Sequence, residues 1–297
     1  MQIGIVLPMS DAEGPGAGRW PQLRALAQQA DGGGIDSLWL YDHFIFRGLE
    51  DEDSGIHEVW TLLSAVAAVT ERAQLGTIVL GTGFRPPALT AKMAATLDEV
   101  SDGRLILGLG TGWHEPEYKA FGYPFDHRAS RFEETLEIIV PLLRGEHVTF
   151  SGTYHQVEDA FLIPPPPRPA RLGGRVPILI AAKGERVMRL TAKWADAWNA
   201  AWFGFPDDRF RQRRADLVRG CEAEDRDPAT MLVTAGITVG EEGESSLPED
   251  VDTIARALDV WRDEGVGHVQ LALHSIEPRT VDLVLEARAR HLGGGAA

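Results

Sequence analysis

The chain's clearest structural signal is Arg104-Leu105-Ile106-Leu107-Gly108-Leu109-Gly110-Thr111-Gly112-Trp113-His114-Glu115. An apolar run that gains glycines only near its carboxyl end is typical of a buried parallel strand whose exit lets another group approach the backbone closely. An indole, an imidazole and a carboxylate follow the glycines, and Pro116 suits the first turn of a helix. We therefore expect a core strand whose exit contributes to a site.

The three glycines Gly108, Gly110 and Gly112 allow two other interpretations. They could be packing glycines beside a neighbouring helix, without a ligand. They could also belong to a dinucleotide-binding fingerprint, which requires the spacing G-x-G-x-x-G at the start of a helix. The spacing here is G-x-G-x-G, which argues against a Rossmann site.

Composition limits the possible partners. The 297 residues are 44% hydrophobic, enough for one α/β barrel or two ordinary domains. A formal net charge of -15 argues against nucleic-acid and anionic-membrane partners, because phosphate binding needs clustered Lys and Arg. Cys221 is the only cysteine, which excludes an internal disulfide framework and a thiolate metal cluster. With no signal-peptide pattern at the start and no apolar run of about 20 residues, we expect a cytoplasmic protein.

Strand-like and helix-like runs alternate along the chain. The strand-like runs are 3–7, 35–41, 74–80, a run that begins at 105, 176–182, 195–200, 231–239 and 268–274, and the helical ones begin near residues 19, 57, 87, 127, 184, 207, 248 and 277. Eight such alternations at this length predict an α/β fold, a (β/α)₈ TIM barrel. A doubly wound open sheet is the alternative, because periodicity does not reveal whether the first and last strands pair.

The fourth and fifth predicted strands are joined by a long connection. We expect an insertion over about 112–175 in a single barrel domain of residues 1–292, with residues 293–297 as a disordered tail. The insertion includes a hairpin-like segment at 148–154 and the run Pro164–Pro167, which cannot join a sheet interior. In a barrel or an open sheet, ligands bind at the carboxyl ends of the strands. The residues just past each strand should therefore converge on one face.

Short motifs along nearly the whole chain carry a family resemblance: Asp42-His43, Pro87–Lys92 continuing to Thr96-Leu97-Asp98, Ser101–Arg104, Gly108–Trp113 and Ala195–Trp198. Together they resemble the luciferase-like monooxygenase superfamily of bacterial-luciferase-like oxidoreductases. The branch that the chain resembles most uses coenzyme F420, a deazaflavin hydride carrier. Sugar-phosphate dehydrogenases of that branch carry an acidic residue directly after G-T-G, where this chain has Trp113.

The resemblance implies catalytic roles for three residues. His43 would lie near the reactive ring carbon and exchange a proton with the substrate, a role suited to imidazole because its unperturbed pKa of about 6.5 is near neutrality. Trp113 would lie beside the ring, and Glu115 is a second candidate for proton transfer. His114 and Trp202 would face the substrate. The alternatives are a structural histidine beside Asp42 and a purely packing role for Trp113.

The resemblance also implies a set of cofactor-binding residues. They are Asp42, Gly81, Thr82, Gly110, Thr111, Gly112, Ala182, Lys183, Gly184, Glu185 and Arg186. Family members bind the cofactor phosphate after the fifth strand, which corresponds to Ala182–Arg186. Independently, a Lys-Gly entry into a helix offers free N–H groups and the positive end of the helix dipole to an anion. An ordinary glycine-assisted helix start is the alternative.

These observations lead to one main hypothesis and two alternatives. The main hypothesis is an oxidoreductase that transfers a hydride between coenzyme F420 and a small organic substrate, with His43 as acid/base. The first alternative is a two-component monooxygenase that uses FMN, and the second is a barrel that binds a ligand without catalysis. We expect no metal, because His114-Glu115 lacks a second histidine four residues later. Family members are often dimers, so we expect a homodimer.

Overall fold

The computed structural model describes residues 1–11, 18–48, 53–165, 174–240, 246–275 and 277–293. Its centre is a closed barrel of eight parallel strands, which confirms the (β/α)₈ prediction over the open sheet. In chain order they are β1 (Gln2–Val6), β2 (Ser37–Leu40), β5 (Gln74–Thr77), β7 (Leu105–Gly110), β10 (Ile178–Ala181), β11 (Ala197–Phe203), β12 (Leu232–Val239) and β14 (His268–Leu273). Each of these strands pairs with the next in this order, including β7 with β10, and the last strand, β14, pairs with the first, β1, which closes the barrel.

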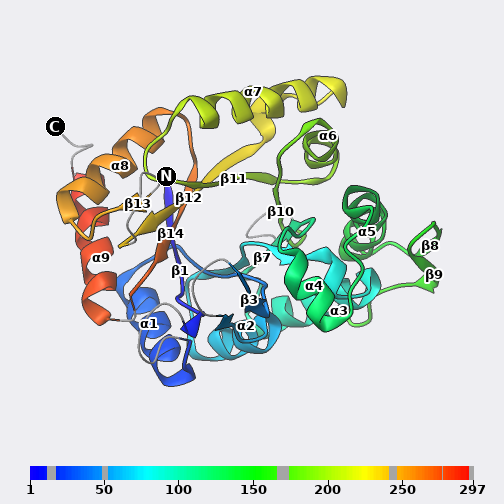
Figure 1. The fold of residues 1–297 in the computed structure, drawn as a ribbon, viewed down its shortest axis with the longest axis horizontal. Helices are drawn as coiled ribbons and strands as arrows, with labels where there is room; N and C mark the ends of the chain where they lie inside the picture. Colours follow the sequence, from blue (N-terminus) through cyan, green and yellow to red (C-terminus); the bar gives the residue numbers. More distant parts are fainter. Residues whose placement is uncertain (12–17, 49–52, 166–173, 241–245, 276, 294–297) are drawn as a thin grey trace.

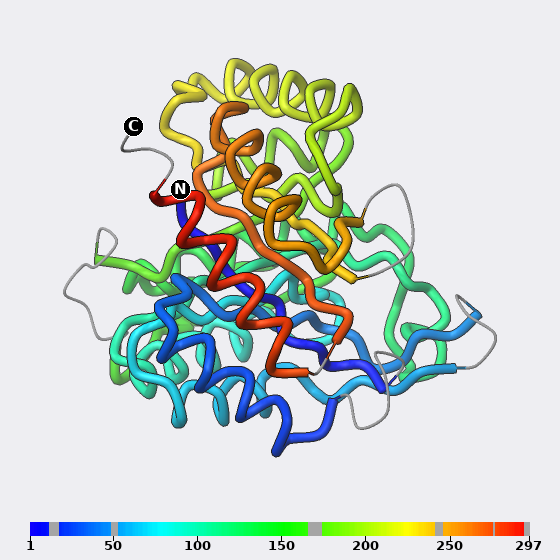
Figure 2. The backbone as a smooth tube through the Cα atoms, turned by 90° about the vertical axis from the view of Figure 1, so that its left-hand side faces the viewer, coloured from blue at the N-terminus to red at the C-terminus, as the bar shows by residue number. Residues whose placement is uncertain are grey.

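Helices cover the outside of this barrel (Figure 1). They are α1 (Trp20–Gly33), α2 (Val59–Val69), α3 (Pro87–Val100), α5 (Arg128–Leu143), α6 (Glu185–Trp194), α7 (Asp208–Ala223), α8 (Val251–Asp263) and α9 (Pro278–Gly293). The last helix, α9, packs beside the first, α1, so the two ends of the described chain meet on one side of the barrel (Figure 2). No helix among the described residues is long and apolar enough to cross a bilayer.

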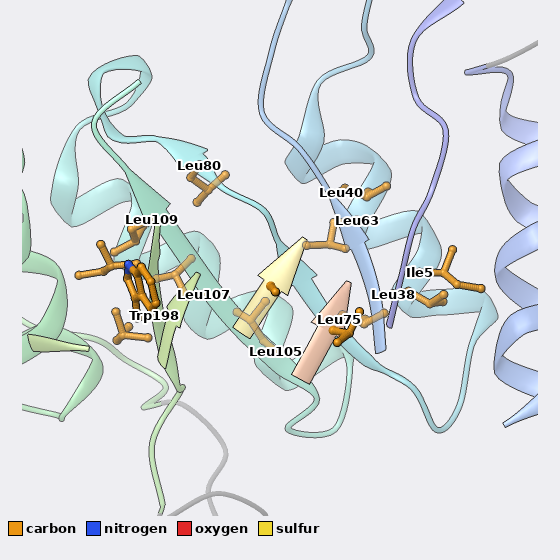
Figure 3. Packing of buried hydrophobic residues seen from close by; sticks show 14 of the residues in the cluster. Ile5, Leu38, Leu40, Leu63, Leu75, Leu80, Leu105, Leu107, Leu109 and Trp198 are labelled. Carbon is orange, nitrogen blue, oxygen red and sulfur yellow. The ribbon is translucent and has the colours of Figure 1, made fainter. Parts of the chain in front are cut away.

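Alternate residues of the strands form two separate apolar layers, as the period of two in a strand requires. Outward-facing leucines such as Leu38, Leu75 and Leu107 pack against the helices in one large cluster (Figure 3). A second, smaller cluster fills the barrel lumen and contains Val6, Trp39, Ile78, Ile106, Leu179 and Ala197. The lumen is therefore a packed core and not a pore.

Trp39 occupies the lumen because its neighbours have no side chains there. A Cβ at Gly4 or Gly76 would overlap the Trp39 indole, whose Nε1 donates to Ser37 Oγ at 2.7 Å. His268 lies edge-on to this indole and its Nε2 is 2.7 Å from the same Ser37 hydroxyl. Burial lowers the pKa of His268 to about 3, so this histidine is neutral in the folded protein near neutral pH.

The connection between β7 and β10 holds four elements that precede the fifth barrel strand. They are α4 (Glu115–Phe121), α5 and the antiparallel pair β8 (Val148–Ser151) and β9 (Gln156–Ala160), which lies outside the barrel (Figure 1). The hairpin is longer than the predicted 148–154, because Gly152–His155 forms the turn and the return strand starts at Gln156. Part of the proline run, residues 166 and 167, and the tail 294–297 lie outside the described residues, whereas Gly293 is the last residue of α9.

Short elements complete the carboxyl-terminal mouth and the periphery of the barrel. They are β3 (Ile45–Phe46), β4 (Ser54–Gly55), β6 (Leu80–Gly81), β13 (Ser246–Leu247) and the 3₁₀ helices η2 (Thr82–Phe84) and η3 (Pro228–Thr230). β3 and β4 form a small antiparallel pair directly after β2, and β6 extends the sheet beside the end of β7. Sequence periodicity did not predict these two-residue strands.

Candidate active site at the carboxyl ends of the strands

His43 follows β2 and is held by a buried carboxylate of α4. Its Nδ1 lies 2.7 Å from Glu117 Oε1, and Glu117 Oε2 accepts a hydrogen bond from the Phe44 N–H at 2.9 Å. The exposed fraction of the side chain is 14% for His43 and 1% for Glu117. Because a carboxylate can only accept, the shared proton belongs to Nδ1 and leaves Nε2 as the unprotonated nitrogen of the neutral ring.

Glu115, which the sequence suggests as a second proton-transfer group, is exposed and forms the first residue of α4. Residues two apart on a helix project about 200° away from each other, so Glu115 and Glu117 cannot both face His43. The carboxylate in contact with the histidine is Glu117, which sequence reasoning missed. The available signal was the spacing of His114, Glu117 and Tyr118, since positions i, i+3 and i+4 share one helix face.

His114 is buried, with 3% of its surface exposed, and does not lie open to a substrate. Its Nε2 accepts the Arg47 backbone N–H at 3.1 Å, which ties α4 to the chain that follows β3. Burial lowers the pKa of His114, and the nearby His43 acts in the same direction while Glu117 opposes it. His114 is thus a neutral anchor for the loop beside His43.

Aromatic rings surround His43. The Phe46 and Trp113 ring centroids lie 4.7 Å and 5.4 Å from the His43 ring centroid, and Tyr41 lies at 6.2 Å. Trp113 is 55% exposed, unusual for an indole, which argues against a pure packing role. An exposed indole beside a titratable ring fits a surface that contacts a flat or apolar ligand.

Asp42 lies beneath this surface in a buried ion pair. Its carboxylate accepts two hydrogen bonds from the Arg85 guanidinium, at 2.7 Å and 3.0 Å, and one from the Gly81 N–H at 3.1 Å. Burial raises the pKa of Asp42, and the Arg85 and Gly81 contacts act against that rise. Arg85 also donates to Glu58, whose carboxylate caps the start of α2. All of these Asp42 contacts are internal, so its position supports the loop that carries His43.

The glycine exit of β7 packs closely against its neighbours. Gly110 pairs with Gly81 of β6, and Thr82 Oγ1 donates to the Gly110 carbonyl at 3.0 Å. Gly112 has a φ of +75°, and a Cβ there would overlap the Tyr118 hydroxyl of α4. Thr111 Oγ1 donates weakly to the Gly112 carbonyl at 3.3 Å. The glycines therefore let β6, β7 and α4 meet beside His43.

The exit of the third barrel strand contains a cis peptide bond between Ile78 and Val79. Val79 lies against the glycine exit, because a Cβ at Gly110 would come within 2.6 Å of Val79 Cγ2. This bond, which the sequence does not reveal, is in the segment that leads into Gly81 and Thr82.

The predicted phosphate-binding residues follow β10. Because β10 and β7 are parallel neighbours, the residues after each strand lie at the same end of the barrel. Ala182 is buried and its carbonyl accepts from Trp198 Nε1 at 3.3 Å, whereas Lys183, Gly184 and Glu185 are exposed. Gly184 has a φ of +79° at the start of α6, and no side chain caps this helix. Its first-turn N–H groups therefore remain available to an anion.

The contacts of Arg186 and Trp202 are with residues other than His43. Arg186 donates to Ser130 Oγ and to Glu133 Oε2 on α5, at 3.0 Å and 2.6 Å. Trp202 is in β11, just past the point where the pairing register between β11 and β12 shifts. It is 39% exposed, and its ring lies where a Cβ at Gly236 would be. Both share the carboxyl-terminal face with His43.

Two cavities of about 270 and 570 Å³ open at the other end of the barrel. Gln2 and Gln74, at the amino ends of β1 and β5, line both. The amino-terminal face of such barrels serves stability, and chemistry occurs at the carboxyl ends. The position of the His43–Glu117 pair at the carboxyl ends is therefore a better guide to the active site than the volume of these two cavities.

Comparison with known proteins matches residues 1–258 to the family model described as luciferase-like monooxygenase. Phthiodiolone/phenolphthiodiolone dimycocerosates ketoreductase of Mycobacterium tuberculosis (strain H37Rv) is 32% identical over 281 residues, covering 84% of this chain and 72% of the relative. F420-dependent glucose-6-phosphate dehydrogenase of Amycolatopsis mediterranei is 36% identical over 178 residues, covering 58% of this chain and 50% of the relative.

Solved structures support the fold. An F420-dependent secondary alcohol dehydrogenase, solved with an F420-acetone adduct, superposes with a TM-score of 0.81 at 18% identity, over 98% of each chain. A monooxygenase from Streptomyces bottropensis gives a TM-score of 0.79 at 21% identity over the whole of both chains. At these identities the likeness shows a shared barrel architecture.

Proposed function

The chain belongs to the luciferase-like monooxygenase family, and from that premise we propose that it is an oxidoreductase that uses coenzyme F420. Two observations support the choice of cofactor. Relatives named F420-dependent glucose-6-phosphate dehydrogenase are 36% and 38% identical over 58% and 60% of this chain. The barrel also resembles that of an F420-dependent secondary alcohol dehydrogenase.

The residues present fit a phosphate-bearing deazaflavin. The uncapped first turn of α6 and the exposed Lys183 offer N–H donors and positive charge, and a Cβ at Gly184 would meet nothing within 4 Å. We propose that Lys183, Gly184 and Glu185 hold the phosphate through this turn, and that the backbone of Gly81–Thr82 and Gly110–Gly112 supports the ring. When bound, the deazaflavin supplies the hydride chemistry.

The chain's own residues supply the proton. The Trp113 ring lies beside His43, and Nδ1 of His43 contacts Glu117. The other ring nitrogen, Nε2, is therefore the one that exchanges a proton with a substrate oxygen. In alcohol oxidation the free Nε2 of the neutral ring takes the hydroxyl proton, and in carbonyl reduction Nε2 of the doubly protonated ring gives its proton to the oxygen and the ring returns to the neutral Nδ1–H form, so one nitrogen serves both directions. The observation that carries the proposal is this half-buried histidine at the end of β2, beside the glycine exit of β7.

The second candidate is an FMN-dependent two-component monooxygenase, because a monooxygenase is among the solved structures with this fold. Oxygen consumption distinguishes the two functions. The protein is given reduced F420 with a panel of ketones and aldehydes, and cofactor oxidation, product and dissolved oxygen are followed together. We expect cofactor oxidation to match product formation without oxygen uptake. Oxygen uptake in proportion to product, with reduced FMN in place of F420, would contradict the proposal.

A further inference from the structure

We propose that Glu117 is the positioning residue that fixes the tautomer of His43, a role that rests on the proposed function of His43 as acid/base. The carboxylate is 1% exposed, its Oε1 lies 2.7 Å from His43 Nδ1, and its Oε2 accepts the Phe44 N–H at 2.9 Å. It therefore clamps one residue's ring and the next residue's backbone. Both contacts lie in the loop that follows β2.

The two contacts leave no choice of proton position. The Phe44 N–H is a backbone donor and cannot become an acceptor, and an ionised carboxylate has no proton to give. The neutral ring must carry its proton on Nδ1, which keeps Nε2 free to accept the substrate proton. No described residue forms a hydrogen bond with His43 Nε2 in the structure.

A second histidine, His114, lies beside His43 but has a different role. His114 Nε2 accepts the Arg47 N–H and its ring is buried, so His114 is committed to a neutral state with a fixed role. Its ring centroid is 6.4 Å from that of His43. Of the two histidines, His114 is thus a structural hydrogen-bond acceptor and His43 is the proposed proton carrier. Glu117 contacts His43.

Glu117→Gln provides a sharp test because the amide has the same shape and can keep both hydrogen bonds. Its oxygen must accept from the Phe44 N–H, since that donor is fixed, so its NH₂ group must face His43 Nδ1. The His43 ring then becomes the acceptor at Nδ1 and moves its proton to Nε2. The substitution should preserve the fold and invert the tautomer. The same inversion explains the loss of activity when the triad aspartate of a serine protease is replaced by asparagine.

The experiment measures the His43 tautomer by long-range ¹H–¹⁵N correlation on the ¹⁵N-labelled protein without cofactor, with His43→Gln to assign the signal. The variants are Glu117→Gln, Glu117→Asp as the conservative replacement, and Glu115→Gln as the matched control two residues away. We expect the Nδ1–H form in the wild type, Glu117→Asp and Glu115→Gln, and the Nε2–H form in Glu117→Gln. Turnover should fall at least about tenfold in Glu117→Gln with KM nearly unchanged, and recover in part in Glu117→Asp.

An Nε2–H ring in the wild type, or equal tautomer and turnover in Glu117→Gln, would overturn the proposal. A tautomer inversion without any change in turnover would instead contradict the acid/base role of His43, while the tautomer assignment would stand. The spectrum requires neither cofactor nor substrate. Failure of the positioning role is therefore distinguishable from failure of the proposed function.

Discussion

The two nitrogens of His43 have different surroundings, because Nδ1 lies against Glu117 and Nε2 forms no hydrogen bond with the described residues. We predict that His43→Ala keeps cofactor affinity within about twofold and lowers turnover by roughly 100-fold or more, the usual contribution of a positioned acid/base. Fluorescence titration of the cofactor and initial rates on the same preparation check both values. Unchanged turnover would remove His43 from the mechanism.

His268 gives a prediction about stability that does not involve catalysis. Its pKa is about 3 in the folded protein and roughly 6.5 when unfolded, so between these values the unfolded chain binds more protons and stability falls as the pH is lowered. This group should remove about 2 kcal/mol of unfolding free energy between pH 7 and pH 5. Urea titrations of His268→Gln at both pH values should show that much less loss than wild type. The exposed His57→Gln is the control and should lose as much as wild type.

Sequence reasoning placed His43 and Trp113 at strand exits, and in the structure their rings are neighbours, but it did not identify Glu117 as the partner of His43. Residue type and order suggested Glu115, whereas helix phase directs Glu117 towards the ring and leaves Glu115 in solvent. The family resemblance suggested that His114 faces the substrate, whereas the structure buries its ring and places its Nε2 against the Arg47 backbone N–H. Helical spacing indicates which residues share the face of α4 with Glu117, but which of them contacts His43 depends on the angle between α4 and the β2 exit, which no local pattern encodes.

At the scale of elements, the glycine exit of β7 depends on its fit to α4. Gly112→Ala places a methyl group against the Tyr118 hydroxyl in a left-handed backbone conformation, whereas Gly122, with nearly the same φ, has open space around it. We predict that Gly112→Ala destabilises the protein by about 1–3 kcal/mol more than Gly122→Ala, since only the first is overpacked. Urea denaturation measures the difference.

A second substitution separates overpacking from backbone strain. The Tyr118 hydroxyl is buried and forms no hydrogen bond with the described residues, so Tyr118→Phe alone should be close to neutral. It should recover part of the stability lost in Gly112→Ala and none of that lost in Gly122→Ala. Equal recovery in both would mean that overlap with the hydroxyl is not the cause.

The start of α6 carries the expected phosphate contact. We predict that Lys183→Ala weakens F420 binding by about threefold to tenfold, more at low than at high salt, because an exposed charge is screened by ions. The rate at saturating cofactor should stay the same. Lys193→Ala, in the last turn of the same helix, is the control, since the dipole end there does not favour an anion. Equal effects of the two substitutions would argue against this binding site.

At the scale of the whole molecule, the sequence predicted nearly every barrel strand and covering helix because each buries a periodic apolar face. Periodicity alone could not reveal whether the first and last strands pair, because that contact joins the two ends of the sequence; in the structure β14 pairs with β1 and closes the barrel. Nor did periodicity indicate that Trp39 fills the lumen over Gly4 and Gly76. Those glycines are complementary to a side chain that lies in another strand, so the relation appears only after the barrel closes.

The central claim is that this barrel binds a deazaflavin for hydride transfer. It is tested most directly by parallel titrations of the purified protein with coenzyme F420 and FMN, following ligand fluorescence. The account predicts saturable binding of F420 with at least about tenfold preference over FMN, equal to roughly 1.4 kcal/mol. Preference for FMN would contradict the account and favour an oxygen-dependent monooxygenase, and binding of neither would contradict both.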